Sequence, residues 1–319
     1  MPHDARIFIA GHRGLVGSAV HRELTRLGYT SLLTRTRAEL DLLDAAAVAA
    51  FFAEARPDFV VLAAAKVGGI LANNTLPADF IRDNLILQTN LIEASRQAAV
   101  QRLLFLGSSC IYPKFAPQPM PESCLLTGPL EPTNRPYALA KIAGIEMCWS
   151  YNRQYGTRYL AAMPTNLYGP NDNFDLHTSH VLPALIRKTA EAMRSGAKAI
   201  TVWGTGTPRR ELLFSEDLAQ ACVFLLNLGD AAYSTLLTES EPPLINIGTG
   251  EDVTIRELAE TVARVLGFHG ALVFDPSRPD GTPRKLMDVS KLHALGWRHR
   301  IALEEGIRLT WDAVREQLA

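Results

Sequence analysis

Short apolar segments alternate with longer segments of helical periodicity in the first half of the chain. The runs at residues 6–10, 59–64 and 102–106 lack the apolar–polar alternation of a half-exposed strand, which predicts strands buried on both faces. The same pattern predicts further strands at 31–34 and 159–163 and helices at 18–27, 45–55, 83–99 and 136–155. Repeated strand–helix–strand units indicate an α/β fold with a doubly wound parallel sheet.

The pattern changes after about residue 173. Residues 172–188 are predicted as a polar loop that runs into an amphipathic helix, and residues 200–214 as a pair of strands around a glycine-rich turn. A buried strand follows at 244–247. A capping box at 254–257 then predicts a helix that ends before Gly267.

This change divides the chain into two expected parts. Residues 1–173 are expected to form the sheet domain, to which the chain returns at about 212–250. Residues 174–211 and 251–319 are expected to form a smaller C-terminal α/β lobe.

Composition and charge narrow the class of protein. The chain has 319 residues, of which 47% are hydrophobic, and its 32 basic and 33 acidic side chains give a net charge of -1. This balance gives no electrostatic reason to expect nucleic acid or an anionic membrane as a partner. The N-terminus is charged where a signal peptide needs an apolar core, and no apolar run approaches the ~20 residues of a membrane span. We therefore expect a cytoplasmic protein that does not span a membrane.

Three glycines follow the first predicted strand. Gly11, Gly14 and Gly17 form G-x-x-G-x-x-G between that strand and the next helix. Glycines let backbone amides approach a pyrophosphate, and the N-terminus of the helix favours negative charge. The motif in this position predicts a Rossmann-type dinucleotide site.

The residues after the second predicted strand distinguish NADP from NAD. An NAD site usually has a carboxylate there that binds the ribose 2′-hydroxyl. This chain has the basic segment 34–37 instead, which ends in Arg37, and Arg13 lies in the glycine loop. These arginines favour a 2′-phosphate and so NADP, although solvated surface arginines remain an alternative.

Tyr137 and Lys141 are four residues apart in a predicted helix, so they share a face. A lysine ammonium near a phenol favours the phenolate and is expected to lower a pKa that starts at about 10. Such a tyrosine exchanges a proton with an alcohol oxygen during hydride transfer. Tyr-x-x-x-Lys is common by chance. The glycine motif and Ser108 at the end of a strand favour a catalytic role for it in this chain.

Together these motifs resemble the extended short-chain dehydrogenase/reductases. Longer stretches are similar to the members of that family that epimerise C3 and C5 of GDP-4-keto-6-deoxy-D-mannose and then reduce C4 with NADPH to give GDP-L-fucose. The stretches are FIAGHRGLVGSA, LAAAKVGGILANNTLPADF, LLFLGSSCIYPK, LEPTNRPYALAKIAG, SYNRQYG, MPTNLYGPNDNF and PDGTPRKLMDVSKL, and they cover almost the whole chain.

The resemblance implies a homodimer that binds NADP(H) and a GDP-sugar. The residues it implies for the cofactor are Gly11, Arg13, Gly14, Leu15, Val16, Gly17, Arg37, Leu106, Gly107, Ser108, Ser109, Lys141, Pro164, Thr165, Asn166, Leu167 and His180. The residues it implies for the sugar nucleotide, in the C-terminal lobe, are Lys188, Trp203, Arg210 and Asp280. Ser108 would bond the C4 oxygen, Tyr137 would donate a proton to it, and Lys141 would assist Tyr137.

The resemblance also implies that Cys110 and His180 are the epimerisation pair. The C–H bonds at C3 and C5 are alpha to the C4 ketone, so inversion through an enolate needs a base on one face and an acid on the other. We hypothesise that Cys110 is the base and His180 the acid, because both groups exchange protons near neutral pH. Cys110 lies two residues after Ser108, so their side chains share a side if the strand continues.

Both residues also have alternative interpretations. A free cysteine is usually a small buried apolar side chain, and the same holds for Cys124, Cys148 and Cys222. His177 and His180 have the spacing of a metal-ligand pair, but no third ligand follows at a supporting distance, so no metal is expected.

Two other function classes remain as alternatives. One is another nucleotide-sugar 4-epimerase, dehydratase or reductase of the same superfamily. A 4,6-dehydratase is expected to have an acid–base pair such as Thr-Asp-Glu where this chain has Cys110. The other is a catalytically silent NADP-sensing protein, against which the presence of Ser108, Tyr137 and Lys141 together argues.

Overall fold

The structure is a computed structural model that describes residues 1–176, 178–278 and 280–318. In this part of the chain six strands form one sheet in which all neighbours are parallel. Their order across the sheet is β10 (Leu244–Ile247), β5 (Tyr159–Pro164), β4 (Arg102–Leu106), β3 (Phe59–Leu62), β1 (Ile7–Ala10) and β2 (Leu32–Leu33). The predicted doubly wound α/β fold is confirmed.

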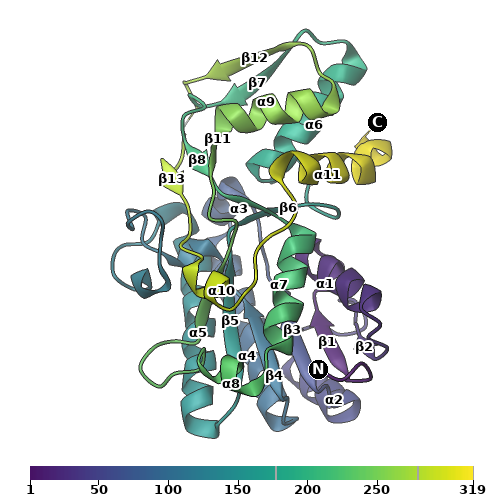
Figure 1. Ribbon diagram of the computed structural model, residues 1–319, viewed down its shortest axis with the longest axis vertical. Coiled ribbons are helices and arrows are strands. Elements are labelled where there is room, and N and C mark those ends of the chain that lie inside the picture. The colour runs from purple at the N-terminus through teal and green to yellow at the C-terminus, as the bar shows by residue number, and fades with distance from the viewer. Residues whose placement is uncertain (177, 279, 319) are drawn as a thin grey trace.

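Helices cover both faces of this sheet (Figure 1). Alternate residues of each strand point to opposite faces, so Phe8 packs in one apolar core and Ile9 in another. The helices of the first face are α2 (Ala45–Ala55), α4 (Pro77–Gln97) and α5 (Arg135–Tyr155), and those of the second are α1 (Leu15–Arg26) and α7 (Ser215–Asn227). Burial on both sides explains the uninterrupted apolar runs of the strands.

A third apolar core lies in the upper part of Figure 1. It packs α6 (Val181–Ser195), α9 (Ile255–Leu266) and α11 (Leu303–Leu318) beside the parallel pair β7 (Ala199–Trp203) and β12 (Ala271–Asp275). Helix α9 begins at the predicted capping box, in which Thr254 and Glu257 each bond the other's backbone N–H.

Short strands and turns connect the two regions. β8 (Arg209–Arg210) pairs with β11 (Val253–Thr254) and β13 (Arg284–Lys285), and β9 (Leu212–Phe214) pairs with β6 (Asn166–Tyr168). Shorter helices are α3 (Ile70–Thr75), α8 (Asp230–Ser234) and α10 (Ser290–Ala294), with 3-10 turns at Ser109–Ile111, Glu122–Cys124 and Pro132–Asn134.

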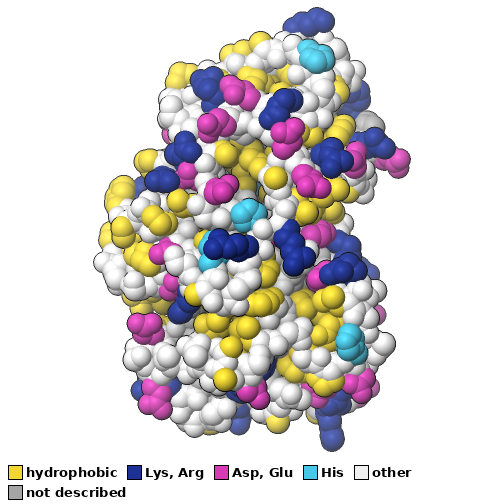
Figure 2. All heavy atoms as spheres, in the orientation of Figure 1, with side chains coloured by type: hydrophobic (Ala, Val, Ile, Leu, Met, Phe, Trp, Pro, Cys, Tyr) yellow, Lys and Arg dark blue, Asp and Glu magenta, His cyan; other side chains and the backbone are white. Residues whose placement is uncertain are grey.

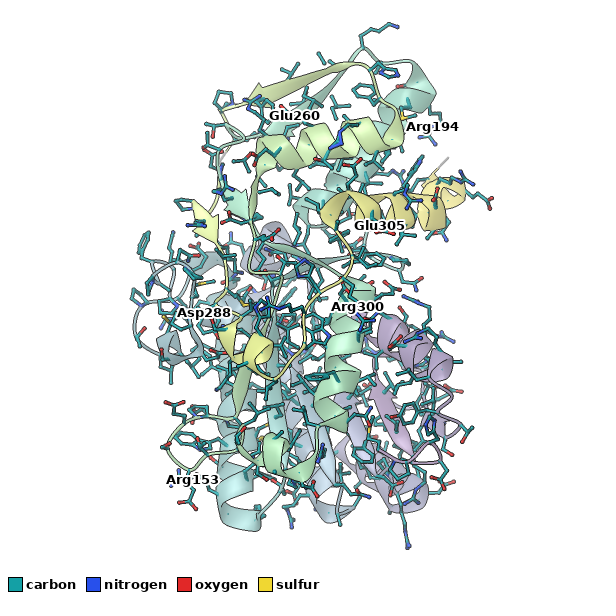
Figure 3. The ribbon with its side chains drawn as sticks, in the orientation of Figure 1. Arg153, Arg194, Glu260, Asp288, Arg300 and Glu305 are labelled. Carbon is teal, nitrogen blue, oxygen red and sulfur yellow. The ribbon has the colours of Figure 1, made fainter. Side chains whose placement is uncertain are left out.

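The C-terminal segment is tied to the sheet region at α7. The buried carboxylate of Asp217 accepts hydrogen bonds of 3.1 and 2.9 Å from the backbone N–H groups of Arg300 and Ile301. Figure 3 shows Arg300 beside α7. The segment that leads into α11 is thereby held against the sheet region.

Two sequence-based predictions need correction. The strands predicted within 200–214 do not pair with each other, because β7, β8 and β9 each take partners from other parts of the chain. The helix predicted at 83–99 begins earlier, at Pro77, since proline suits the first turn of a helix.

The surface has no dominant charge on the face shown in Figure 2, where basic and acidic side chains are interspersed. Among the described residues, no helix is both long enough and apolar enough to cross a membrane.

Candidate active site

The glycine loop closes tightly between β1 and α1. A Cβ atom on Gly17 would lie 2.2 Å from the carbonyl oxygen of Gly11, and a Cβ on Gly11 would lie 2.8 Å from the backbone nitrogen of Ala64. Gly11 also has a φ of +87°, which disfavours other residues. Gly14 then precedes α1, whose first turn contains Leu15 and Val16. The predicted loop therefore presents the N-terminus of a helix at the end of a buried strand, as an anion site requires.

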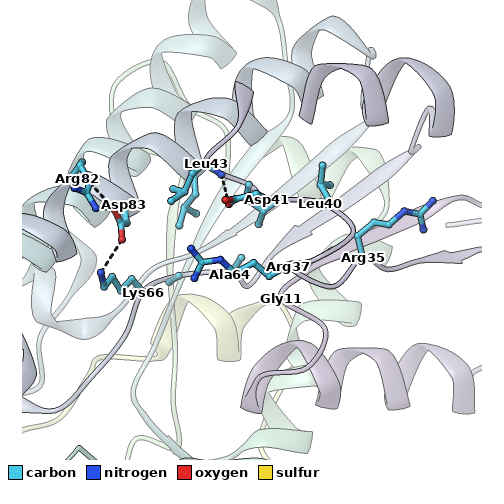
Figure 4. A pocket seen from close by; sticks show the side chains of 13 residues that line it. Gly11, Arg35, Arg37, Leu40, Asp41, Leu43, Ala64, Lys66, Arg82 and Asp83 are labelled. Atoms are coloured by element: carbon cyan, nitrogen blue, oxygen red, sulfur yellow. Dashed lines mark hydrogen bonds and ion pairs between the residues drawn. The ribbon is translucent and has the colours of Figure 1, made fainter. Parts of the chain in front are cut away.

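A cavity of about 510 Å³ lies next to this loop. Its lining residues are Gly11, Arg35, Arg37, Leu40, Asp41, Leu42, Leu43, Ala64, Ala65, Lys66, Arg82, Asp83 and Leu87. In Figure 4, Arg37 extends toward Ala64, whereas Arg35 points the other way. Arg35 instead places its guanidinium 4.9 Å from the ring centre of Phe51. Both arginines of the predicted basic segment therefore line the cavity, but only the side chain of Arg37 extends toward Ala64, and Arg13 is exposed outside the lining.

Sequence reasoning missed an ion cluster in the wall of this cavity. Lys66 Nζ lies 2.9 Å from an oxygen of Asp83 and 3.2 Å from one of Asp79, and Arg82 contacts Asp83 at 2.7 Å. The hydrogen bond with Asp83 raises the pKa of Lys66. The signal was Lys66 itself, a charged residue that ends the apolar run of β3 and the three alanines after it.

The predicted tyrosine and lysine occupy the first two turns of α5. Lys141 is only 2% exposed, and its Nζ donates a hydrogen bond of 2.8 Å to the carbonyl oxygen of Leu106. The same nitrogen lies 5.8 Å from the ring centre of Tyr137. Burial lowers the pKa of Lys141 to about 8. Burial also raises the pKa of Tyr137, so the expected lowering of that pKa by the lysine is not found.

Ser108 and Cys110 follow the end of β4 without continuing the strand. Ser109–Ile111 form a 3-10 turn, in which the Ser108 hydroxyl accepts a 3.5 Å hydrogen bond from the backbone N–H of Cys110. The strand therefore does not continue to Cys110, so the condition for a shared strand face is not met. The turn nevertheless keeps the two side chains together, and a charge on Cys110 affects the pKa of both Tyr137 and Lys141.

The Cys110 thiol is buried, and this burial raises its pKa. The charges of Lys285 and Lys141 and the hydrogen bond with Ser108 act in the opposite direction. Lys285 was not predicted as a site residue. Lys285 is far from Cys110 in sequence, and the pairing of β13 with β8 helps to bring it to the site.

His180 is the residue immediately before α6. Solvent reaches its imidazole, yet the surrounding protein and then the charge of Lys285 lower the pKa of this side chain. Lys285 therefore acts electrostatically on both Cys110 and His180. The loop before His180 is fixed by a 3.0 Å hydrogen bond from the N–H of Gly69 to the carbonyl oxygen of Thr178.

The segment Pro164–Leu167 lies at the end of β5. The N–H of Thr165 donates to Ile247 in β10, and the side chains of Thr165 and Asn166 both donate to the carbonyl oxygen of Glu211, at 3.3 and 2.9 Å. Gly107 packs against the same strand, because its Cβ would lie 2.0 Å from the Met163 side chain. The segment predicted to line the nicotinamide is thus rigidly held beside β4 and β10.

Two of the predicted substrate residues form one pair. Lys188 Nζ donates to Thr201 and lies 5.2 Å from the ring centre of Trp203, which is 57% exposed. Arg278, which was not predicted, lies 5.0 Å from the same ring. An exposed indole flanked by cations is suited to an anionic aromatic ligand such as a nucleotide.

The other two predicted substrate residues meet at a loop. Arg210 Nη1 donates to the carbonyl oxygens of Arg209 and Thr282, both at 2.7 Å. Asp280 accepts from the N–H and hydroxyl of Thr205, at 2.7 and 2.9 Å. Through these bonds Asp280 joins its own loop to the turn at Thr205, and so helps to hold the shape of the site.

The cysteines and the possible metal ligands are the remaining predicted features. Cys110, Cys124, Cys148 and Cys222 all lie within the described residues and are free and buried. His177 lies outside them. In the described part of the chain, no three His, Cys, Asp or Glu side chains are grouped so as to hold a metal ion.

A model of the NAD dependent epimerase/dehydratase family matches residues 7–248, from the start of β1 to just after β10. The chain belongs to this family. Among its relatives in the epimerase/dehydratase family, GDP-L-fucose synthase of Escherichia coli K12 is 58% identical over 309 residues, with 96% of this chain and 95% of the relative covered. GDP-L-fucose synthase 1 of Arabidopsis thaliana is also 58% identical, with 97% and 93% covered.

A solved structure of the same epimerase/dehydratase fold is the GDP-mannoheptose C4 reductase of Campylobacter jejuni with NADP bound. It is 40% identical, with a TM-score of 0.90 and 99% of both chains covered. These similarities over nearly the full length confirm the resemblance inferred from the motifs.

Proposed function

We propose that this protein is a bifunctional epimerase and reductase that converts GDP-4-keto-6-deoxy-D-mannose into GDP-L-fucose with NADPH. The observation that carries the proposal is the cluster of Ser108, Cys110, Tyr137 and Lys141 at the carboxyl end of β4. The cluster joins a reductase dyad to a buried thiol. The relatives named GDP-L-fucose synthase support the choice of substrate.

The glycine loop and cavity fit NADPH. Because Gly17 has no Cβ, α1 packs directly against the backbone of Gly11, and the N-terminus of this helix would bind a diphosphate. Arg37 lines the cavity, where it would bind a 2′-phosphate. The NADP named with the Campylobacter reductase supports this choice. The cofactor supplies hydride for reduction at C4. Pro164–Leu167, fixed to β10 and Glu211, would hold the nicotinamide end.

Epimerisation needs a base that removes the protons at C3 and C5. Cys110 would serve as thiolate, and the raised pKa of its thiol makes that thiolate a stronger base once formed. Lys285 and Lys141 favour its formation. Ser108 and Tyr137 would hold the C4 oxygen while it carries the enolate charge. His180 would return a proton on the opposite face.

Reduction needs a proton on the C4 oxygen as hydride arrives. Because burial raises the pKa of Tyr137, its phenol is protonated at neutral pH and ready to donate. Lys141, fixed to Leu106, would stabilise the phenolate left behind. The order of steps follows from the chemistry, since the protons at C3 and C5 are acidic only while C4 is a ketone.

The sugar nucleotide would lie between the two regions. Lys188, Trp203 and Arg210 would bind the nucleotide, with Asp280 fixing the turn at Thr205 between Trp203 and Arg210. In this proposal residues 1–173 and 212–250 form the NADP domain, while 174–211 and 251–319 form the substrate lobe, which the separate core of α6, α9 and α11 supports.

The protein would act as a homodimer in the cytoplasm. Ile86 on α4 and Leu139 on α5 are exposed apolar side chains on two helices that pack together, which suits a helical interface between subunits. The free cysteines fit a reducing compartment.

The decisive experiment incubates the purified protein with GDP-4-keto-6-deoxy-D-mannose and NADPH. We expect loss of NADPH absorbance and a product with inverted C3 and C5, assigned by NMR. Tyr137→Phe should lose most reduction while deuterium from solvent still enters C3 and C5. A reduced product that keeps the D-configuration would indicate a simple C4 reductase, and no turnover would favour a sensor.

A further inference from the structure

Glu211 is a fully buried carboxylate with no role in the proposed chemistry. Its Oε1 accepts hydrogen bonds from the backbone N–H groups of Thr249 and Gly250, at 2.7 and 2.8 Å. Its Oε2 accepts from the backbone N–H of Met287, at 3.0 Å. The residue lies directly after Arg210 and before β9.

These bonds join segments that are far apart in sequence. Thr249 and Gly250 follow β10 at the edge of the sheet, whereas Met287 follows β13. The main chain of Glu211 adds further links. Its N–H donates to the carbonyl oxygen of Lys285, at 3.2 Å, and its own carbonyl accepts from the side chains of Thr165 and Asn166, at 3.3 and 2.9 Å. One residue therefore connects the nicotinamide segment with the segment that carries Lys285.

The surrounding chain is shaped to admit this carboxylate. A Cβ on Gly248 would lie 2.2 Å from Glu211 Oε1 and 2.8 Å from its Cδ. Burial raises the pKa of Glu211, and the backbone N–H groups partly offset this effect. The three backbone N–H groups donate to both side-chain oxygens of Glu211. A carboxylate has two acceptor oxygens, whereas the amide of glutamine has only one.

The segment after β13 also fixes the loop that follows Cys110. The N–H of Leu286 donates to the side chain of Gln118, at 2.8 Å, and the carbonyl of Leu286 accepts from the N–H of Met120, at 2.9 Å. The segment then runs to Asp288, which accepts from the N–H of Ser290 and lies beside α10 in Figure 3.

We propose that Glu211 is a positioning residue that holds segment 284–287, and with it the Lys285 ammonium, in register with Cys110 and with the nicotinamide segment. This inference rests on the proposed epimerase function. Loosening Met287 would move the charge of Lys285 away from Cys110 and His180. Epimerisation should then suffer more than cofactor binding, because the glycine loop and Arg37 make no contact with this segment among the bonds described.

The test is Glu211→Gln. The new amide can keep one oxygen toward Thr249 and Gly250, but its NH₂ group then faces the N–H of Met287, donor against donor. We expect deuterium exchange at C3 and C5 to fall on the order of 10- to 100-fold, since small displacements in a site have effects of this size. The Kd for NADPH should change less than about threefold. Glu239→Gln, at an exposed glutamate, is the matched control.

Two further measurements separate positioning from a general structural role. Amide hydrogen exchange should show lost protection in residues 284–287 of Glu211→Gln, with β4 and β5 unchanged. The pH dependence of sugar exchange should shift, because Lys285 no longer favours the Cys110 thiolate. Equal losses in exchange, reduction and NADPH binding, without a change in the pH profile, would overturn the proposal.

Gly248→Ala supplies a second variant, since the new Cβ would collide with Oε1 of Glu211 and displace the carboxylate. It should show the same loss of exchange with retained NADPH affinity. If the wild-type protein does not turn over the keto sugar, the proposed function fails. Amide hydrogen exchange would still decide whether Glu211 holds the segment, and unchanged protection of residues 284–287 in both variants would refute it.

Discussion

Lys141 Nζ donates a 2.8 Å hydrogen bond to the carbonyl oxygen of Leu106, the last residue of β4. The sheet, and not Tyr137, therefore fixes the position of this ammonium, which lies 5.8 Å from the Tyr137 ring centre. The bond anchors the first turns of α5 to the carboxyl edge of the sheet. It places a cation near Tyr137 and near the Cys110 thiol, whose pKa the charge of Lys141 lowers.

The buried lysine predicts an alkaline limit for reduction. Because burial lowers the pKa of Lys141 to about 8, the ammonium loses its proton as pH rises through about 8. We expect the rate of NADPH oxidation to fall over this range. Lys141→Arg keeps a positive charge to much higher pH, so its profile should extend upward. Lys198→Met, at an exposed lysine, should leave the profile unchanged, and an unshifted limit in Lys141→Arg would exclude Lys141 as its cause.

The raised pKa of Cys110 predicts a pH dependence of the opposite sign. Thiolate forms as pH rises, so deuterium exchange at C3 and C5 should become faster toward alkaline pH. Cys110→Ser should lower exchange by at least ~100-fold, as loss of a general base does. Any residual reduction should give the uninverted sugar. Cys124→Ser is the control, and wild-type exchange in Cys110→Ser would remove the thiol from the mechanism.

Arg37 and Arg35 give a matched pair for cofactor choice. Both line the cavity, but the Arg37 side chain extends toward Ala64, whereas the Arg35 guanidinium points the other way and stacks on Phe51. Loss of one charged hydrogen bond to a phosphate corresponds to roughly tenfold or more in affinity. Arg37→Ala should therefore raise the KM for NADPH by about this factor and leave the KM for NADH nearly constant. Equal effects on both cofactors, or a larger effect in Arg35→Ala, would argue against a 2′-phosphate contact.

Gly17 and Gly229 test the close packing of the glycine loop. A Cβ on Gly17 would lie 2.2 Å from the Gly11 oxygen, whereas a Cβ on Gly229 would meet nothing within 4 Å among the described residues. Gly17→Ala should lower the free energy of unfolding by about 1–3 kcal/mol, in the range of overpacked sites, and weaken NADPH binding. Gly229→Ala should change neither. Urea denaturation and NADPH fluorescence measure both effects.

Local periodicity predicted the elements that carry the dyad and the glycine loop. Tyr137 and Lys141 share a helix, so their spacing alone fixes their common face. The β1–α1 connection is equally local, since Gly11, Gly14 and Gly17 all lie between the end of β1 and the first turn of α1. The parallel sheet could also be predicted, because strands buried on both faces have a distinctive apolar pattern.

The errors arose where the geometry depends on distant segments. The partners of β8 are β11 and β13, which lie far from it in sequence, so residues 200–214 looked like a self-contained hairpin. The same pairing brings Lys285 to Cys110, and no local spacing indicates it. The turn at Ser109–Ile111 is local, but an apolar strand followed by small polar residues does not specify where extended backbone ends.

β10 forms one edge of the cofactor-binding sheet and pairs with β5. In sequence, however, α6, β7 and α7 lie between these two strands. A ribosome must therefore synthesise α6, β7 and α7 before the sheet receives its last strand. Until then β5 presents an unpaired edge to the solvent, the type of surface on which nascent chains aggregate. A chain cut after Asn173 would retain the glycine loop and the dyad, but it would carry this exposed edge permanently.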